Sequence, residues 1–100
     1  MSAVADFRLE TGTPATLGVS GVLDFDTAAA ALAAIRAALE AGGAAQLDLA
    51  GVRHCDSAGL ACVLAAAADA ARRGRPLRVV GMPSGMQALA QVCEVDSLLA

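Results

Sequence analysis

The hydrophobic residues of the chain recur with two different periods, and a period of two marks strands. Weak alternation predicts an edge strand over 7–11 and a partner strand over 16–20, joined as a hairpin by a Gly-Thr-Pro turn. Apolar runs predict two buried strands over 45–50 and 77–81. A glycine directly follows the stretches 16–20 and 45–50, so we expect those two strands to end there.

A period of three to four residues marks three helices. The first lies between the Asp24–Thr27 segment, which offers N-cap side chains, and a Gly-Gly pair. The second is expected from Ser57 to Arg73, and the third begins at a capping box formed by Ser84 and Gln87. The residues expected to face inward are Leu32, Ile35 and Leu39 in the first helix, Leu60, Val63, Leu64, Ala67 and Ala71 in the second, and Met86, Leu89, Ala90 and Cys93 in the third.

The order of these elements defines a fold class. Two strands are followed by helices that alternate with single strands, an order that implies right-handed crossovers and parallel pairing. We therefore expect one α/β domain over residues 1–100, with a mostly parallel sheet of four to five strands, an N-terminal hairpin and three or more helices.

Composition narrows the classes of function. The apolar fraction of 57% excludes an intrinsically disordered chain. Nucleic-acid binding is not expected, because aromatics are 2% of the residues, lysine is absent and the net charge is −3. The longest apolar stretches, 28–35 and 58–68, are shorter than the roughly 20 residues of a membrane span, so no membrane insertion is expected.

The cysteines and the N-terminal residues indicate a compartment. Cys55, Cys62 and Cys93 are odd in number and irregularly spaced, which predicts reduced thiols and no paired zinc motif. Charged residues interrupt the first ten positions, so no secretory signal is expected there. Together these features predict a cytoplasmic protein.

The junction between the 45–50 strand and the second helix is the strongest candidate for a functional site. Ligands and partners of open α/β sheets sit at the carboxyl ends of strands, and a helix start attracts anions. A serine at this place, Ser57, can cap the helix, accept a phosphoryl group or present its hydroxyl to another protein. Small residues in the first turn, Ala58, Gly59 and Ala61, would let another surface approach closely.

Catalysis, metal binding and a cofactor are not predicted. His54, Cys55 and Asp56 are adjacent on an extended segment, so their side chains point in opposite directions and are poorly placed to share an ion. No oxyanion site accompanies Ser57, and no glycine-rich phosphate loop is present. A basic cluster over 72–78 has two interpretations, a solvated helix terminus or a contact with an acidic partner or headgroup.

Three stretches together resemble one family. The residues at the junction are Asp56, Ser57, Ala58, Gly59 and Leu60, and with the preceding strand they resemble the signature loop of STAS domains, which sulfate transporters and anti-sigma factor antagonists share. The stretch 19–24 resembles the end of the strand before the family's first helix, and 77–82 the strand before its last helices. The resemblance covers residues 17–99 and is closest to the MlaB-type branch, the small cytoplasmic STAS subunits of bacterial phospholipid-transport ABC complexes.

This resemblance implies a non-catalytic subunit that regulates or assembles a transporter. It would bind the ATPase subunit, which works with a permease, through the Ser57 hydroxyl and the exposed face of the following helix. Asp56, Ala58, Gly59 and Leu60 would shape the loop. The contact residues expected on the helix face are Ala58, Ala61, Cys62, Ala65 and Asp69. The alternative that the resemblance implies is an anti-sigma factor antagonist, in which a kinase-type anti-sigma factor phosphorylates Ser57.

Overall fold

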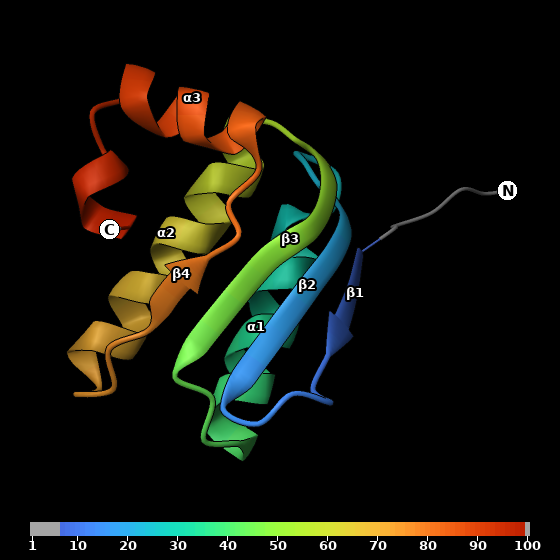
Figure 1. Cartoon of the computed structure of the whole chain (residues 1–100), viewed down its shortest axis with the longest axis vertical. Helices are drawn as coiled ribbons and strands as arrows, with labels where there is room; N and C mark the ends of the chain where they lie inside the picture. The colour runs from blue at the N-terminus through green and yellow to red at the C-terminus, as the bar shows by residue number, and fades with distance from the viewer. Residues whose placement is uncertain (1–6, 100) are drawn as a thin grey trace, which may run out of the picture.

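The computed structural model describes residues 7–99, which form a four-stranded sheet with helices packed against it (Figure 1). The sheet order is β1-β2-β3-β4, with β1 antiparallel to β2 and the remaining pairs parallel. The expected α/β fold with an N-terminal hairpin is therefore confirmed. In chain order the elements are β1 (Phe7–Glu10), β2 (Thr16–Leu23), α1 (Ala28–Ala41), β3 (Gln46–Cys55), α2 (Ser57–Arg72), β4 (Arg78–Val80), α3 (Ser84–Val92) and the 3-10 helix η1 (Asp96–Leu99).

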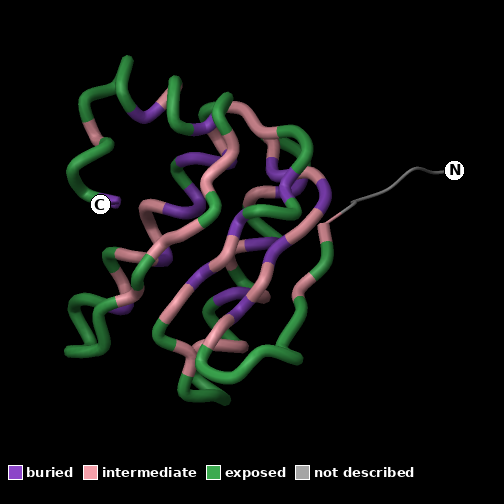
Figure 2. The backbone as a smooth tube through the Cα atoms, viewed as in Figure 1, coloured by how far each residue is buried: buried purple, intermediate pink, exposed green. Residues whose placement is uncertain are grey.

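Strand β2 forms the centre of the core and is longer than the sequence pattern predicts. Its residues alternate between partly exposed and buried along the whole strand, as Figure 2 shows in pink and purple. The expected end at Gly21 is wrong: Gly21 pairs with Phe7 on one side and Val52 on the other. Its φ of +95° lies in the region that favours glycine, so this residue lets the strand continue in an unusual conformation.

Strand β3 also continues past its expected end at Ala50. The sequence pattern does not reveal this, because irregularities in the pairing of β3 with β2 interrupt the alternation of buried and exposed residues. Gly18 pairs with Asp48 but Ser20 pairs with Gly51, so β3 carries one extra residue between these pairs. At Gly51 a Cβ would lie 2.7 Å from the Cβ of Ser20, so only glycine fits this close approach. The extra residue returns Val52 to the buried face.

Helices α1 and α2 lie side by side against one face of the sheet, behind it in Figure 1, and the core lies between. The sheet covers one side of α2 and α1 covers another, so the single inward stripe predicted for α2 is only partly correct. Leu60 and Val63 are buried as expected, whereas Leu64 and Ala67 are half-buried and Ala71 is exposed. The buried residues of α2 are Gly59, Leu60, Cys62, Val63, Ala66 and Ala70.

Helix α3 buries Met86 and Ala90 as expected, but its start and end differ from the prediction. Pro83 occupies the N-cap, and the side-chain Nε2 of Gln87 donates to the Met82 carbonyl at 3.2 Å, so no capping box forms. Because α3 ends at Val92, Cys93 leaves the inward face and is exposed. Across residues 7–99, no helix combines the length and the apolar character that a membrane crossing requires.

Candidate functional site

Parallel pairing of β2 and β3 brings two segments, far apart in sequence, to one edge of the sheet. Leu23 pairs with Cys55 at the carboxyl ends of the two strands. The turn from Asp24 to Thr27 therefore lies beside the start of α2, near the top of Figure 1. The Asp56 amide donates to the Leu23 carbonyl at 3.3 Å, and the Phe25 amide donates to Oδ2 of Asp56 at 3.0 Å.

Asp56, not Ser57, caps helix α2. Oδ1 of Asp56 accepts hydrogen bonds from the amides of Ala58 at 2.9 Å and Gly59 at 3.1 Å. Ser57 is the first helical residue and is exposed, and within residues 7–99 its hydroxyl forms no hydrogen bond. Ser57 was expected to cap the helix, accept a phosphoryl group or contact another protein, and the capping role belongs to Asp56 instead. Its hydroxyl is available to a partner or to a phosphoryl group.

The Asp56 carboxylate is stabilised in its charged form. Partial burial raises its pKa. The amides of Gly59, Phe25 and Ala58 and the nearby His54 lower the pKa by more than burial raises it, so the pKa lies below its ordinary value. Burial and the charge of Asp56 raise the pKa of the Cys55 thiol, which is therefore a poor nucleophile at neutral pH. Among the described residues, no group of three His, Cys, Asp or Glu side chains is placed to hold a metal ion.

The turn from Asp24 to Thr27 is held rigidly by its own polar side chains. Oδ1 of Asp24 accepts from the amides of Asp26 and Thr27 at 3.0 and 3.1 Å. The hydroxyl of Thr27, which is 4% exposed, donates to the Val22 carbonyl at 2.9 Å and accepts from the Asp24 amide at 2.9 Å. Thr27 therefore fastens the turn to β2 and does not cap α1 with its side chain.

Phe25, in the middle of this turn, is 82% exposed although it is a large hydrophobic residue. Its amide is bonded to Asp56, so its backbone is adjacent to the start of α2. The sequence pattern did not single out Phe25, because its neighbours read as N-cap residues of α1. Only its position as an aromatic between two polar residues could have indicated it.

The predicted contact residues divide into exposed and buried sets. Ser57 and Ala61 are exposed, and Ala58 and Ala65 are half-buried, so these four lie along an accessible side of α2. The placement of Cys62 on that side is wrong: it is 3% exposed, because α1 covers the neighbouring side of α2.

Two other residues of the predicted loop are also buried, although they shape the start of α2 as expected. Gly59 packs against the end of β2, where a Cβ would overlap the Leu23 carbonyl oxygen, and Leu60 belongs to the core. The small size of Gly59 therefore serves contact within the chain rather than the approach of another protein.

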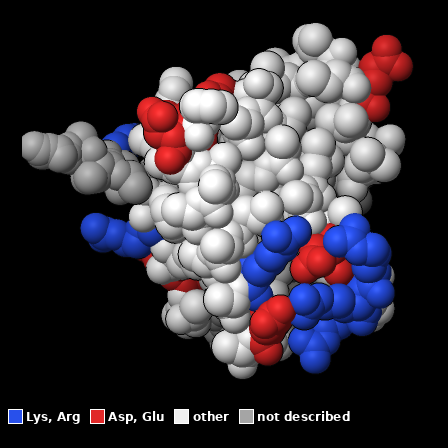
Figure 3. Space-filling model, turned by 180° about the vertical axis from the view of Figure 1, so that it is seen from behind, with Lys and Arg blue, Asp and Glu red and all other residues white. Residues whose placement is uncertain are grey.

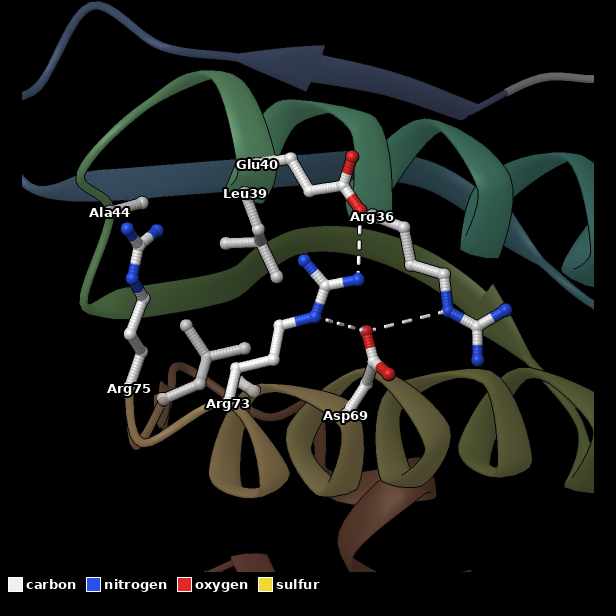
Figure 4. Close-up of a pocket in the computed structure, with 9 residues that line it drawn as sticks. Arg36, Leu39, Glu40, Ala44, Asp69, Arg73 and Arg75 are labelled. Carbon is white, nitrogen blue, oxygen red and sulfur yellow. Dashed lines mark hydrogen bonds and ion pairs between the residues drawn. The ribbon is translucent and has the colours of Figure 1, made fainter.

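Asp69, also expected to contact a partner, instead lies among arginines of this chain. Its carboxylate pairs with Arg72 at 3.0 Å, Arg73 at 3.5 Å and Arg36 at 3.7 Å, and Arg73 also pairs with Glu40 at 2.8 Å. Figure 4 shows Arg36, Glu40, Asp69 and Arg73 bridging α1 and α2. Figure 3 shows a group of basic side chains with acidic ones among them at the lower end of that face. The carboxylates engage Arg72 and Arg73 of the basic cluster, whereas no ion pair within residues 7–99 joins Arg75 or Arg78.

Replacing Asp69 with asparagine is expected to lower the free energy of unfolding by less than about 1 kcal/mol, because its three ion pairs are partly exposed to water. Urea unfolding at low salt measures this loss, and 1 M NaCl should reduce it by screening. Glu10→Gln on β1 is the control with the same change in charge. A loss that stays the same in high salt would contradict a surface ion-pair network.

The fold and this site define a small α/β domain that presents a hydroxyl at the start of its second long helix. A family model described as "Mlab, STAS domain" matches residues 8–100, and the chain belongs to this family of MlaB-type STAS domains. Its structure is similar to that of the anti-sigma factor antagonist SpoIIAA in its unphosphorylated form. The TM-score is 0.63 with 21% sequence identity, over 85% of this chain and 81% of the other. No curated protein matches the chain.

Proposed function

We propose that this chain is a non-catalytic regulatory subunit of a bacterial phospholipid-transport ABC complex. It binds the ATPase subunit, which works with a membrane permease, through the start of α2, and so acts on the cytoplasmic side of the membrane. The observation that carries the proposal is the Ser57 hydroxyl, exposed and without a hydrogen bond to residues 7–99. Membership of the MlaB-type family supports the choice of partner.

The geometry around Ser57 suits docking more than chemistry. Asp56 holds both the first turn of α2 and the neighbouring turn at Phe25, so the surface exists before a partner arrives. Preorganisation of this kind lowers the entropy cost of association. The exposed Ala61 and half-buried Ala65 continue the surface along α2 with side chains small enough for close helix packing.

Ser57→Arg is expected to abolish pull-down of the ATPase subunit of the organism's phospholipid transporter while the chain stays folded. A long charged side chain at an exposed first helical position leaves the core intact but separates the two surfaces. Thr13→Arg is the matched control, because Thr13 is an exposed hydroxyl residue that precedes β2 at the opposite end of the sheet. Retained binding by the folded Ser57→Arg variant would refute the docking site.

The second candidate function is an anti-sigma factor antagonist controlled by phosphorylation of Ser57. It is supported by the fold similarity to SpoIIAA and by the exposed hydroxyl at a helix N-terminus, where the helix dipole favours a phosphate. A phosphate would add a charge of about −1.5 to −2 beside Asp56 and would expel a partner without a basic pocket.

Incubation with the organism's kinase-type anti-sigma factors and ATP, followed by mass spectrometry, separates the two candidates. A phosphate on Ser57, absent in Ser57→Ala, would favour the antagonist. An unmodified chain that binds the ABC ATPase would favour the transporter subunit.

A further inference from the structure

The side chain of Phe25 points into solvent from a turn whose backbone is held in place by hydrogen bonds. Phe25 is 82% exposed, while the backbone on either side is fixed by hydrogen bonds to Asp24, Asp56 and Thr27. The buried Thr27 hydroxyl anchors the same turn to β2. An aromatic ring that is exposed on a rigid support resembles the anchor residues that contribute most to protein interfaces.

The charges beside the ring indicate what it would contact. Asp24 and Asp26 flank Phe25, and among the described residues no ion pair joins either carboxylate to a basic side chain. His54 on β3 pairs in register with Val22, two residues before Asp24, and no ion pair joins His54 or Arg53 to these acids within residues 7–99. The side chain of Asp26 forms no hydrogen bond within residues 7–99, since only its backbone amide is engaged.

We propose that the Asp24–Phe25–Asp26 turn binds an arginine of the docking partner. The guanidinium stacks on the exposed face of the Phe25 ring, and the Asp26 carboxylate accepts its hydrogen bonds. This inference rests on the proposed docking function. It names the side chain of the partner that would contact the turn held to the start of α2 by Asp56.

Arginine fits this turn better than lysine or an apolar side chain. Its planar guanidinium stacks on aromatic faces and donates several hydrogen bonds in a fixed plane, whereas the lysine ammonium is compact and strongly hydrated. An apolar side chain would bury Phe25 but would leave the Asp26 carboxylate without a partner. The acids also attract a basic surface from a distance, so association should be faster at low salt.

The first experiment measures the affinity of the ABC ATPase for single variants. Phe25→Leu keeps an apolar side chain but removes the ring face, and we expect about fivefold weaker binding. Asp26→Asn keeps the shape but removes the charge, and should weaken binding by a similar factor and reduce its dependence on salt. Leu98→Ala and Glu10→Gln are the controls, because Leu98 is another exposed large hydrophobic and Glu10 another exposed acid.

The second experiment needs no protein partner. A blocked arginine, N-acetylarginine methylamide, is titrated into isotope-labelled chain and followed by NMR. We expect shifts confined to residues 24–27, absent with the blocked lysine analogue and lost in Phe25→Leu.

The outcomes separate this inference from the proposed function. If Ser57→Arg abolishes ATPase binding while Phe25→Leu and Asp26→Asn bind as the unchanged chain does, the arginine contact is refuted and the docking site stands. If the unchanged chain does not bind the ATPase, the proposed function is refuted and the arginine titration decides the inference. Equal responses to the arginine and lysine compounds, or none, would overturn it.

Discussion

Gly59→Ala is expected to destabilise the fold by about 3 kcal/mol or more, although alanine normally favours a helix. A Cβ at this position would overlap the carbonyl oxygen of Leu23 and lie 2.8 Å from its carbonyl carbon. Both are backbone atoms at the end of the central strand, so no side-chain rotation can relieve the clash. The start of α2 would have to move away from β2, which would also separate Ser57 from Phe25.

The matched control is Gly85→Ala, a glycine near the start of α3 whose Cβ would meet no atom within 4 Å. This variant should gain up to about 1 kcal/mol from helix propensity alone. Urea unfolding of both variants measures the contrast, and an unchanged m value would show that both still unfold in the same way. A Gly59→Ala variant as stable as the unchanged chain would contradict the contact between α2 and Leu23.

Asp56→Ala is expected to lower the free energy of unfolding by about 1–3 kcal/mol. The substitution removes the cap of α2, with hydrogen bonds of 2.9 and 3.1 Å, and also the 3.0 Å bond to the Phe25 amide. Its effect on partner binding should exceed its effect on folding, because the two segments of the docking surface lose the side chain that joins them. Thermal or urea unfolding measures the first effect, and the ATPase pull-down measures the second.

The contribution of Asp56 also depends on pH in a definite direction. Its pKa in the folded chain lies below the ordinary value of about 3.9, because backbone amides donate to the carboxylate. The carboxylate therefore stabilises the fold fully above that ordinary value, and the stabilisation is lost as the pH falls through the folded-state pKa. Asp56→Asn keeps a capping oxygen but cannot titrate, so its stability difference from the unchanged chain should shrink in acid. A difference that does not change with pH would contradict this role.

The site combines two structural features that serve one surface. Asp56 holds the turn of one strand to the helix that follows another, and Gly59 lets that helix begin directly against β2. Ser57 and Phe25 are both exposed because their neighbours form the internal contacts. The partner that we propose would therefore meet the Ser57 hydroxyl and the Phe25 ring on a surface that exists before it binds.

The sequence was sufficient for the order and type of the elements, because hydrophobic periodicity and the turn residues are local signals. It also located the serine at the start of α2. The predicted ends of β2 and β3 were wrong. Gly21 and Gly51 look like strand breaks in the sequence, but both pair with residues of neighbouring strands and the strands continue through them. The burial of Cys62 and the ion pairs of Asp69 were missed because both depend on α1, a distant part of the chain.

The amino-acid sequence by itself determined the α/β fold class, the family resemblance and the identity of the exposed hydroxyl residue. Only the tertiary structure decided which neighbour caps the helix, which side of α2 is accessible and that the backbone of Phe25 is bonded to Asp56, the residue before Ser57. The physical reason is that periodicity reports whether a residue faces a core, but not which element covers it. That second property arises from parallel pairing of β2 with β3 and from packing of α1 on α2.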